Sequence, residues 1–91
     1  MMGEYQFRGF TIPGHMMESL VAYIEDRRPV GHFLTAILQN DLKEAVARAD
    51  DHNLANLPAY IGYLYNSAPS PCWGSPQKVA KWLAKETDNG L

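Results

Sequence analysis

The sequence predicts an all-α protein: a compact bundle of four or five short helices with a short extended N-terminal arm. Two observations carry this prediction. Apolar residues recur at three- and four-residue spacing through most of the chain, which is the period of an amphipathic helix. Proline, glycine and asparagine interrupt the pattern at intervals that leave room only for short helices. We expect the arm over residues 1–12, a single helical domain over 13–87 and a C-terminal tail over 88–91.

Size and composition fit one small folded domain. The 91 residues are 46% apolar, 11% aromatic and 20% charged, a balance that excludes a disordered chain. The net charge of −2 excludes a basic nucleic-acid-binding protein. A single cysteine excludes a disulfide framework and fits a reducing compartment. No apolar run reaches the roughly 18 residues of a membrane span, and no signal peptide is recognisable, so we expect a cytosolic protein.

The N-terminal arm alternates aromatic and polar residues. Tyr5 and Phe7 are followed, after Gly9, by Phe10 and Ile12. Alternation of this kind predicts a short strand or an extended arm whose aromatic side is covered.

The first helix opens at Pro13 and Gly14. Its buried side is predicted from Met16, Met17, Leu20, Val21 and Ile24. We expect the helix to end at Arg27 and Arg28, because the residue before Pro29 avoids the helical region. This places both arginines in the last turn, where the helix dipole favours cations.

The segment 30–51 has one continuous apolar stripe and would fit one long helix. We predict instead two helices, over 30–39 and 41–51, with a break at Asn40. Asparagine tolerates the left-handed conformation that ends helices. Asp41 then begins the D-x-x-E pattern of a capping box.

Prolines and caps mark the last two helices. Pro58 is tolerated in the first turn of a helix, so we start the fourth helix near Asn56. A loop follows over 66–71, and Ser75 with Pro76 gives the clearest helix start in the sequence. The predicted core consists of Leu20, Ile24, Phe33, Leu34, Ile37, Val46, Ile61, Leu64 and Leu83.

Polar clusters supply few candidates for chemistry. The three histidines lack the spacing of metal ligands, so we expect no metal site and no cofactor. Asp50, Asp51 and Asn53 form the densest polar cluster, at the predicted end of a helix. Carboxylates there oppose the helix dipole and should have a partner, such as an arginine or the N-terminus of a neighbouring helix. We favour a structural role for this cluster over acid–base chemistry or divalent-ion binding.

Cys72 lies in the run S-P-C-W-G-S-P, with no histidine nearby that would serve as its base. A nucleophilic thiol needs such a base and an electropositive setting. We therefore expect an inert, packed thiol and no catalytic residue.

The C-terminal third is rich in aromatic side chains with polar tips, which binding surfaces use to fill a partner's pocket or to stack on a base. We expect Tyr63 and Tyr65 to be the most exposed of them. The predicted binding surface consists of Arg27, Arg28, Tyr63, Tyr65, Trp73 and Ser75. The aromatic residues exceed what one small core hides, which predicts a homo-oligomer, with a dimer as the commonest form.

The sequence resembles a group of small phage and prophage proteins in five runs: I-P-G-H-M-M, P-V-G-H-F-L-T-A-I-L-Q-N-D-L, R-A-D-D-H-N, L-Y-N-S-A-P and W-G-S-P-Q-K-V-A-K-W. The resemblance covers residues 12–83, and Pro58 departs from the pattern. It implies a setting rather than a mechanism: an accessory protein of a temperate phage, made in the cytoplasm of the bacterial host.

A phage accessory protein without catalytic motifs is expected to act by binding. The first hypothesis is a non-enzymatic inhibitor that covers a host defence or regulatory protein, as anti-CRISPR proteins do. The alternative is a sponge that sequesters a nucleotide immune signal in a pocket of a homo-oligomer, which needs cations at the phosphates. The negative net charge favours the protein target. A signal-degrading enzyme would need Asp50, Asp51 and a histidine to converge, and it ranks last. We expect no contact with a membrane or directly with nucleic acid.

Overall fold

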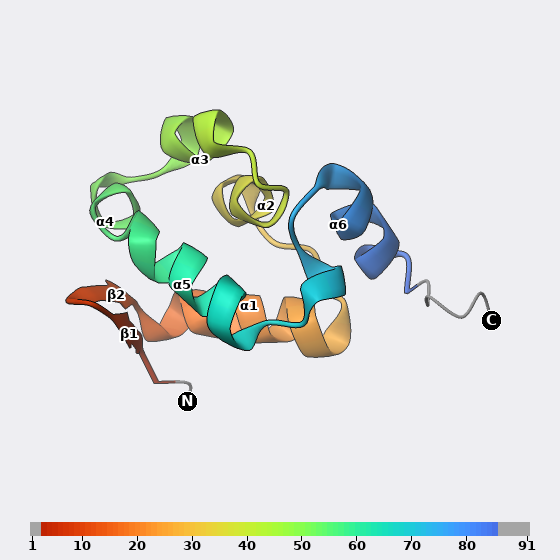
Figure 1. The fold of residues 1–91 in the computed structure, drawn as a ribbon, viewed down its shortest axis with the longest axis horizontal. Coiled ribbons are helices and arrows are strands. Elements are labelled where there is room, and N and C mark those ends of the chain that lie inside the picture. Colours follow the sequence, from red (N-terminus) through yellow and green to blue (C-terminus); the bar gives the residue numbers. More distant parts are fainter. Residues whose placement is uncertain (1–2, 86–91) are drawn as a thin grey trace.

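A computed structural model describes residues 3–85, and helices dominate this part of the chain (Figure 1). The elements are β1 (Tyr5–Phe7), β2 (Phe10–Ile12), α1 (Gly14–Asp26), α2 (His32–Leu38), α3 (Leu42–Arg48), α4 (Asp51–Ala55), α5 (Leu57–Ser67), the 3-10 helix η1 (Ser70–Cys72) and α6 (Pro76–Leu83). The all-α prediction is correct for most of the chain and wrong for the arm, which forms a two-stranded sheet. The predicted tail over 88–91 lies outside the described residues, as do residues 86 and 87 of the predicted helical domain.

The arm folds back on itself as an antiparallel hairpin in which Phe7 pairs with Phe10. The two turn residues, Arg8 and Gly9, have φ values of 51° and 84°, the positive values that a tight two-residue hairpin turn needs. An isolated hairpin is marginally stable, so its aromatic side requires a partner. That partner is α5, where a Cβ atom at Gly62 would lie 2.6 Å from the Phe7 ring. Only glycine leaves room for this packing.

The first helix begins at Gly14 as predicted, but it ends before the two arginines. Arg27 is the C-cap residue, with a φ of 58°, and its N–H donates to the carbonyl oxygen of Tyr23. The prediction that both arginines lie in the last turn is therefore wrong. The chain leaves the helix through a left-handed residue rather than at the residue before Pro29.

The predicted break at Asn40 is confirmed. Asn40 adopts a φ of 62°, and the Asp41 side chain accepts a hydrogen bond of 3.2 Å from the N–H of Glu44. The second helix starts at His32 instead of residue 30, because Gly31 is still extended and acts as its N-cap.

The third helix is shorter than predicted. It ends at Arg48, Ala49 is extended, and Asp50 begins a separate helix, α4. The Asp50 side chain accepts a hydrogen bond of 2.7 Å from the N–H of Asn53, and Asp51 lies in the first turn. The placing of Asp50 and Asp51 at a helix end is thus wrong. Both carboxylates lie instead at the start of α4, where the helix dipole favours negative charge. The N-terminus of α4 is therefore the partner that we expected for them.

The fourth predicted helix is α5, and it starts at the position predicted from Pro58. Asn56 is the N-cap of α5, and Pro58 lies in the first turn. The Asn56 side chain also accepts a hydrogen bond of 2.8 Å from the N–H of Thr11, which ties the hairpin to this helix.

The predicted loop over 66–71 is partly helical, since α5 continues to Ser67 and η1 follows. The cap at Ser75 is confirmed, because the Ser75 hydroxyl accepts a hydrogen bond of 3.1 Å from the N–H of Lys78.

The core lies between α1, α2, α5 and α6, and Tyr23 and Tyr60 are the largest fully buried side chains. Five predicted core residues are buried: Leu20, Phe33, Leu34, Ile37 and Leu64. Ile24 and Leu83 are half-buried against them. Val46 and Ile61 were predicted in the core and are exposed, because no element among residues 3–85 covers their sides of α3 and α5.

Candidate binding surface

Four of the six predicted binding residues are only partly exposed, and each of them makes contacts within the fold. Arg27 is a structural residue: its Cζ atom lies 3.5 Å from the centroid of the Trp82 ring, and its Nη1 donates a hydrogen bond of 3.1 Å to the Trp82 carbonyl oxygen. The Trp82 indole Nε1 donates in turn to the carbonyl oxygen of Tyr23 at 2.9 Å. These contacts hold the end of α1 against α6.

Three more of the predicted residues serve the fold. The Ser75 hydroxyl is used in capping α6, and Trp73 is half-buried against the core. Tyr63 is half-buried with its ring edge-on to Tyr5 at 5.1 Å, and burial raises its pKa, with smaller effects from the neighbouring Cys72, Glu25 and Tyr5. Arg28 and Tyr65 remain as exposed members of the predicted set.

The polar cluster is also structural. Asp50 caps α4, and the Asn53 side-chain oxygen accepts a hydrogen bond of 2.8 Å from the Tyr60 hydroxyl. Burial, together with the nearby Asp50 charge, raises the pKa of Tyr60 to about 12. Asp51 is exposed to solvent. In residues 3–85, no three histidine, cysteine or acidic side chains gather as metal ligands would.

The Cys72 thiol is fully buried, as the sequence predicts. Burial raises its pKa to about 11, which keeps the thiol protonated at neutral pH. The Tyr23 hydroxyl donates a hydrogen bond of 2.7 Å to the Cys72 carbonyl oxygen, so this residue joins η1 to α1. A protonated, enclosed thiol is not a nucleophile.

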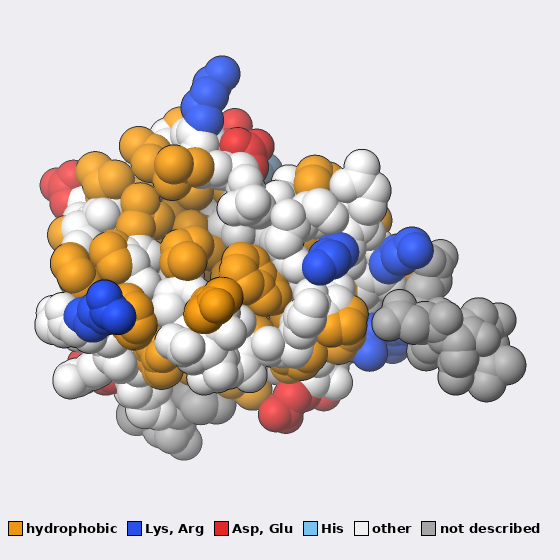
Figure 2. Space-filling model, viewed as in Figure 1, with side chains coloured by type: hydrophobic (Ala, Val, Ile, Leu, Met, Phe, Trp, Pro, Cys, Tyr) orange, Lys and Arg blue, Asp and Glu red, His pale blue; other side chains and the backbone are white. Residues whose placement is uncertain are grey.

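A different set of residues makes a surface. Five large apolar side chains are exposed among residues 3–85: Leu42 (69%), Val46 (44%), Leu54 (44%), Ile61 (42%) and Tyr65 (80%). They belong to α3, α4 and α5, and we call them the α3–α5 face. Figure 2 shows hydrophobic side chains gathered across this side of the molecule, in the view in which α3 and α5 lie toward the reader. Of the residues predicted for binding, Tyr65 belongs to this face.

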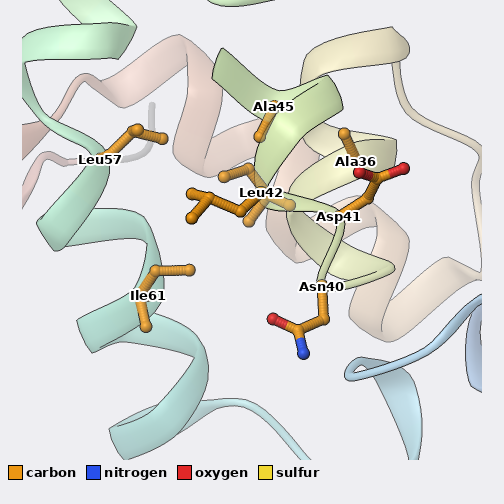
Figure 3. Close-up of a pocket in the computed structure, with 8 residues that line it drawn as sticks. Ala36, Asn40, Asp41, Leu42, Ala45, Leu57 and Ile61 are labelled. Atoms are coloured by element: carbon orange, nitrogen blue, oxygen red, sulfur yellow. The ribbon is translucent and has the colours of Figure 1, made fainter. Parts of the chain in front are cut away.

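A shallow groove runs between α3 and α5 (Figure 3). Leu42 points from the start of α3 toward α5, and Leu57 and Ile61 point back toward it from α5. Ala45 lines the same wall as Leu42, and Asp41 lies at one end. The groove is therefore apolar along its walls, with a carboxylate at its margin.

The spacing along α5 explains why part of it stays uncovered. Tyr60 and Leu64 lie on one side of the helix and are buried. Leu57, Ile61 and Tyr65 recur every four residues along another side, which faces the groove and the solvent. Residues 57–67 contain no charged side chain, and this signal in the sequence marks α5 as a helix that is apolar on two sides.

Comparison with known proteins gives no match: no family model, no curated protein and no solved structure is similar to this chain. Among residues 3–85, the helices are too short or too polar to cross a lipid bilayer. The functional argument therefore rests on the surface itself.

Proposed function

We propose that the protein is a phage-encoded, non-enzymatic inhibitor that binds a host defence or regulatory protein through the α3–α5 face. The observation that carries the proposal is an apolar groove lined by two of the five large exposed apolar side chains, Leu42 and Ile61, with the other three on the same helices or on α4. Exposed apolar patches on small proteins mark sites of interaction with other proteins. The phage setting is supported by the sequence resemblance, and the host cytoplasm is the compartment it implies.

Binding is favoured over catalysis because the candidate reactive groups serve the fold. Asp50 caps a helix, Asn53 accepts from a buried tyrosine, and the Cys72 thiol is enclosed. Each of these groups has a structural task that accounts for its position.

A protein target is favoured over a nucleotide signal because two of the arginines that a phosphate site would use are engaged within the fold. Arg27 is held against Trp82, and Arg48 pairs with Glu44 at 2.8 Å on α3. The groove itself carries the Asp41 carboxylate at its margin, which repels phosphate groups. The nucleotide sponge therefore remains the alternative.

Affinity capture from an infected host tests the proposal. The tagged wild-type chain is compared with a Leu42→Ser/Val46→Ser variant, which removes two exposed apolar side chains. The matched control is Ala47→Ser, which changes an exposed residue of the same helix outside the face. Bound proteins are identified by mass spectrometry, and small molecules released by heating are analysed in parallel.

We expect one host protein to be retained by the wild type and the control and lost from the double variant, and its purified activity to fall when the wild type is added. Release of a nucleotide on heating, with no host protein retained, would support the sponge instead. Equal retention by all three chains would place the binding surface elsewhere.

A further inference from the structure

The segment between α2 and α5 is attached to the rest of the molecule by small side chains. It covers residues 41–55, which include α3 and α4, and we call it the α3–α4 flap. Within it, Ala45 is buried and Ala49 is half-buried against the core, while the larger apolar side chains are exposed. All five residues of α4 are at least partly exposed. The flap therefore contributes little apolar burial to the fold.

The helices that surround the flap are anchored by larger side chains. Helix α2 buries five of its seven residues, and α1 and α5 bury the rings of Tyr23 and Tyr60. A segment with few buried apolar contacts opens at a low cost in free energy, while well-buried elements exchange only through global unfolding. This difference separates the flap from α1, α2 and α5.

The flap is bounded and divided by residues that leave the helical conformation. Asn40, just before it, has a φ of 62°, and Ala49, between α3 and α4, is extended with a ψ of 138°. Asn56 ends α4 and begins α5 with a φ of −116°. Hinge motions are absorbed by a few residues at the ends of elements. These three residues stand where a moving flap needs its hinges.

A side-chain hydrogen bond fastens the flap between these hinges. The Tyr60 hydroxyl, on α5, donates a hydrogen bond of 2.8 Å to the side-chain oxygen of Asn53, on α4. The Tyr60 ring is fully buried and lies edge-on to Phe33 at 5.2 Å. The hydroxyl is therefore held at a fixed place, from which it restrains α4.

We propose that the α3–α4 flap opens as a unit while α1, α2, α5 and α6 stay folded, and that the hydrogen bond between Tyr60 and Asn53 is the latch that holds it closed. Helix α3 packs on α2 and forms one wall of the groove. Ala36 and Ile37, on α2, also line the groove and are buried while the flap is closed. Opening uncovers them, so the flap sets how much apolar surface the groove offers.

The motion belongs to the free chain and goes beyond the proposed function. Its effect on a host protein rests on that function, because it changes the groove to which the host protein is assigned. A measurement on the free chain therefore tests the flap separately from the host target.

Amide hydrogen exchange, followed by mass spectrometry of peptides, is that measurement. In the wild-type chain the hydrogen-bonded amides of α3 and α4 should exchange at least about tenfold faster than those of α1 and α5, after correction for intrinsic rates. Tyr60→Phe should accelerate exchange in both α3 and α4 by about two- to tenfold, the equilibrium factor that corresponds to one net hydrogen bond.

Arg27→Ala is the matched control, since Arg27 fastens α1 to α6 outside the flap. It should accelerate exchange in α1 and α6, where opening breaks this contact, and leave exchange in the flap at the wild-type rate. Equal acceleration of α1 and the flap by Arg27→Ala would overturn the flap, because the two would then open only together.

Three other outcomes would also contradict the proposal. Equal wild-type exchange in the flap and in α5 would exclude local opening, and acceleration by Tyr60→Phe in α4 alone would exclude opening as a unit. Unchanged flap exchange in Tyr60→Phe would exclude the latch. A chain without local opening that still retains a host protein would leave the proposed function standing.

Discussion

The Arg27 side chain contacts both the side chain and the backbone carbonyl of Trp82. The Arg27 guanidinium lies over the indole ring and donates to the Trp82 carbonyl, while the indole N–H donates to the Tyr23 carbonyl at the end of α1. Two residues 55 positions apart in the sequence thus connect the end of α1 with α6. The contact gives Arg27 a structural role, whereas the sequence pattern predicted this residue at a binding surface.

Replacing Arg27 with alanine should lower the free energy of unfolding by about 1–3 kcal/mol, because the cation–π contact and a charged hydrogen bond are lost together. The measurement is urea unfolding followed by tryptophan fluorescence. Arg28→Ala is the matched control, since the Arg28 side chain is exposed, and it should change stability by less than about 0.5 kcal/mol. Equal effects of the two substitutions would contradict the structural role of Arg27.

Gly62→Ala should destabilise the protein by about 1–3 kcal/mol, since the new methyl group would come within 2.6–2.9 Å of three carbons of the Phe7 ring. In a Phe7→Leu background the same substitution should cost less, because a smaller side chain leaves room. A double-mutant cycle measures this difference as a coupling energy of about 0.5–3 kcal/mol. Strict additivity of the two substitutions would show that hairpin and helix do not pack as described.

Asp50→Ala should cost about 0.5–2 kcal/mol, the usual effect of losing an N-cap side chain. Asp51→Ala, one residue further on, removes a carboxylate of the first turn that caps nothing, and should cost less than about 0.5 kcal/mol. Thermal unfolding of the two variants at neutral pH makes the comparison. A larger effect at Asp51 would argue for a task beyond helix capping.

The free energy of unfolding should fall as the pH rises from about 9 to 12. Burial raises the pKa of Cys72 from 9.0 to about 11 and, with the Asp50 charge, that of Tyr60 from 10.0 to about 12. Each group contributes its full stabilisation below its unfolded value and loses it as the pH climbs through the folded value. The slope is at most about 1.4 kcal/mol per pH unit for each group. Urea unfolding at pH 8 and pH 11 measures this dependence of the free energy of unfolding on pH. The Tyr60→Phe variant should show a smaller slope. An unchanged slope in that variant would exclude Tyr60 as a source of the effect.

Local signals in the sequence predicted the helix boundaries well. The break at Asn40, the start at Asn56 and the cap at Ser75 depend on the conformations that single residues allow, so they need no knowledge of the rest of the fold. The start of α4 at Asp50 follows the same chemistry. The sequence prediction missed this helix start because the apolar stripe of residues 30–51 continues across it.

The covered side of each helix was harder to predict. Apolar residues at helical spacing predict burial, and Val46 and Ile61 satisfy the spacing, but burial also requires another element to cover them. A chain of 91 residues does not supply that element within its described part. The exposure of Tyr65 was predicted, whereas the rest of the α3–α5 face was not. The lack of charge in residues 57–67 was a signal in the sequence for the part of the face on α5.

The contact between Phe7 and Gly62 has a consequence for how this sequence changes over generations. A bulky residue at position 62 and an aromatic ring at position 7 exclude each other, because both would occupy the same few cubic ångströms. Position 62 is therefore not free to gain a side chain while the ring remains at position 7. Descendant sequences that lose the glycine should first have lost the ring, so that substitutions at two sites 55 residues apart are inherited in a fixed order.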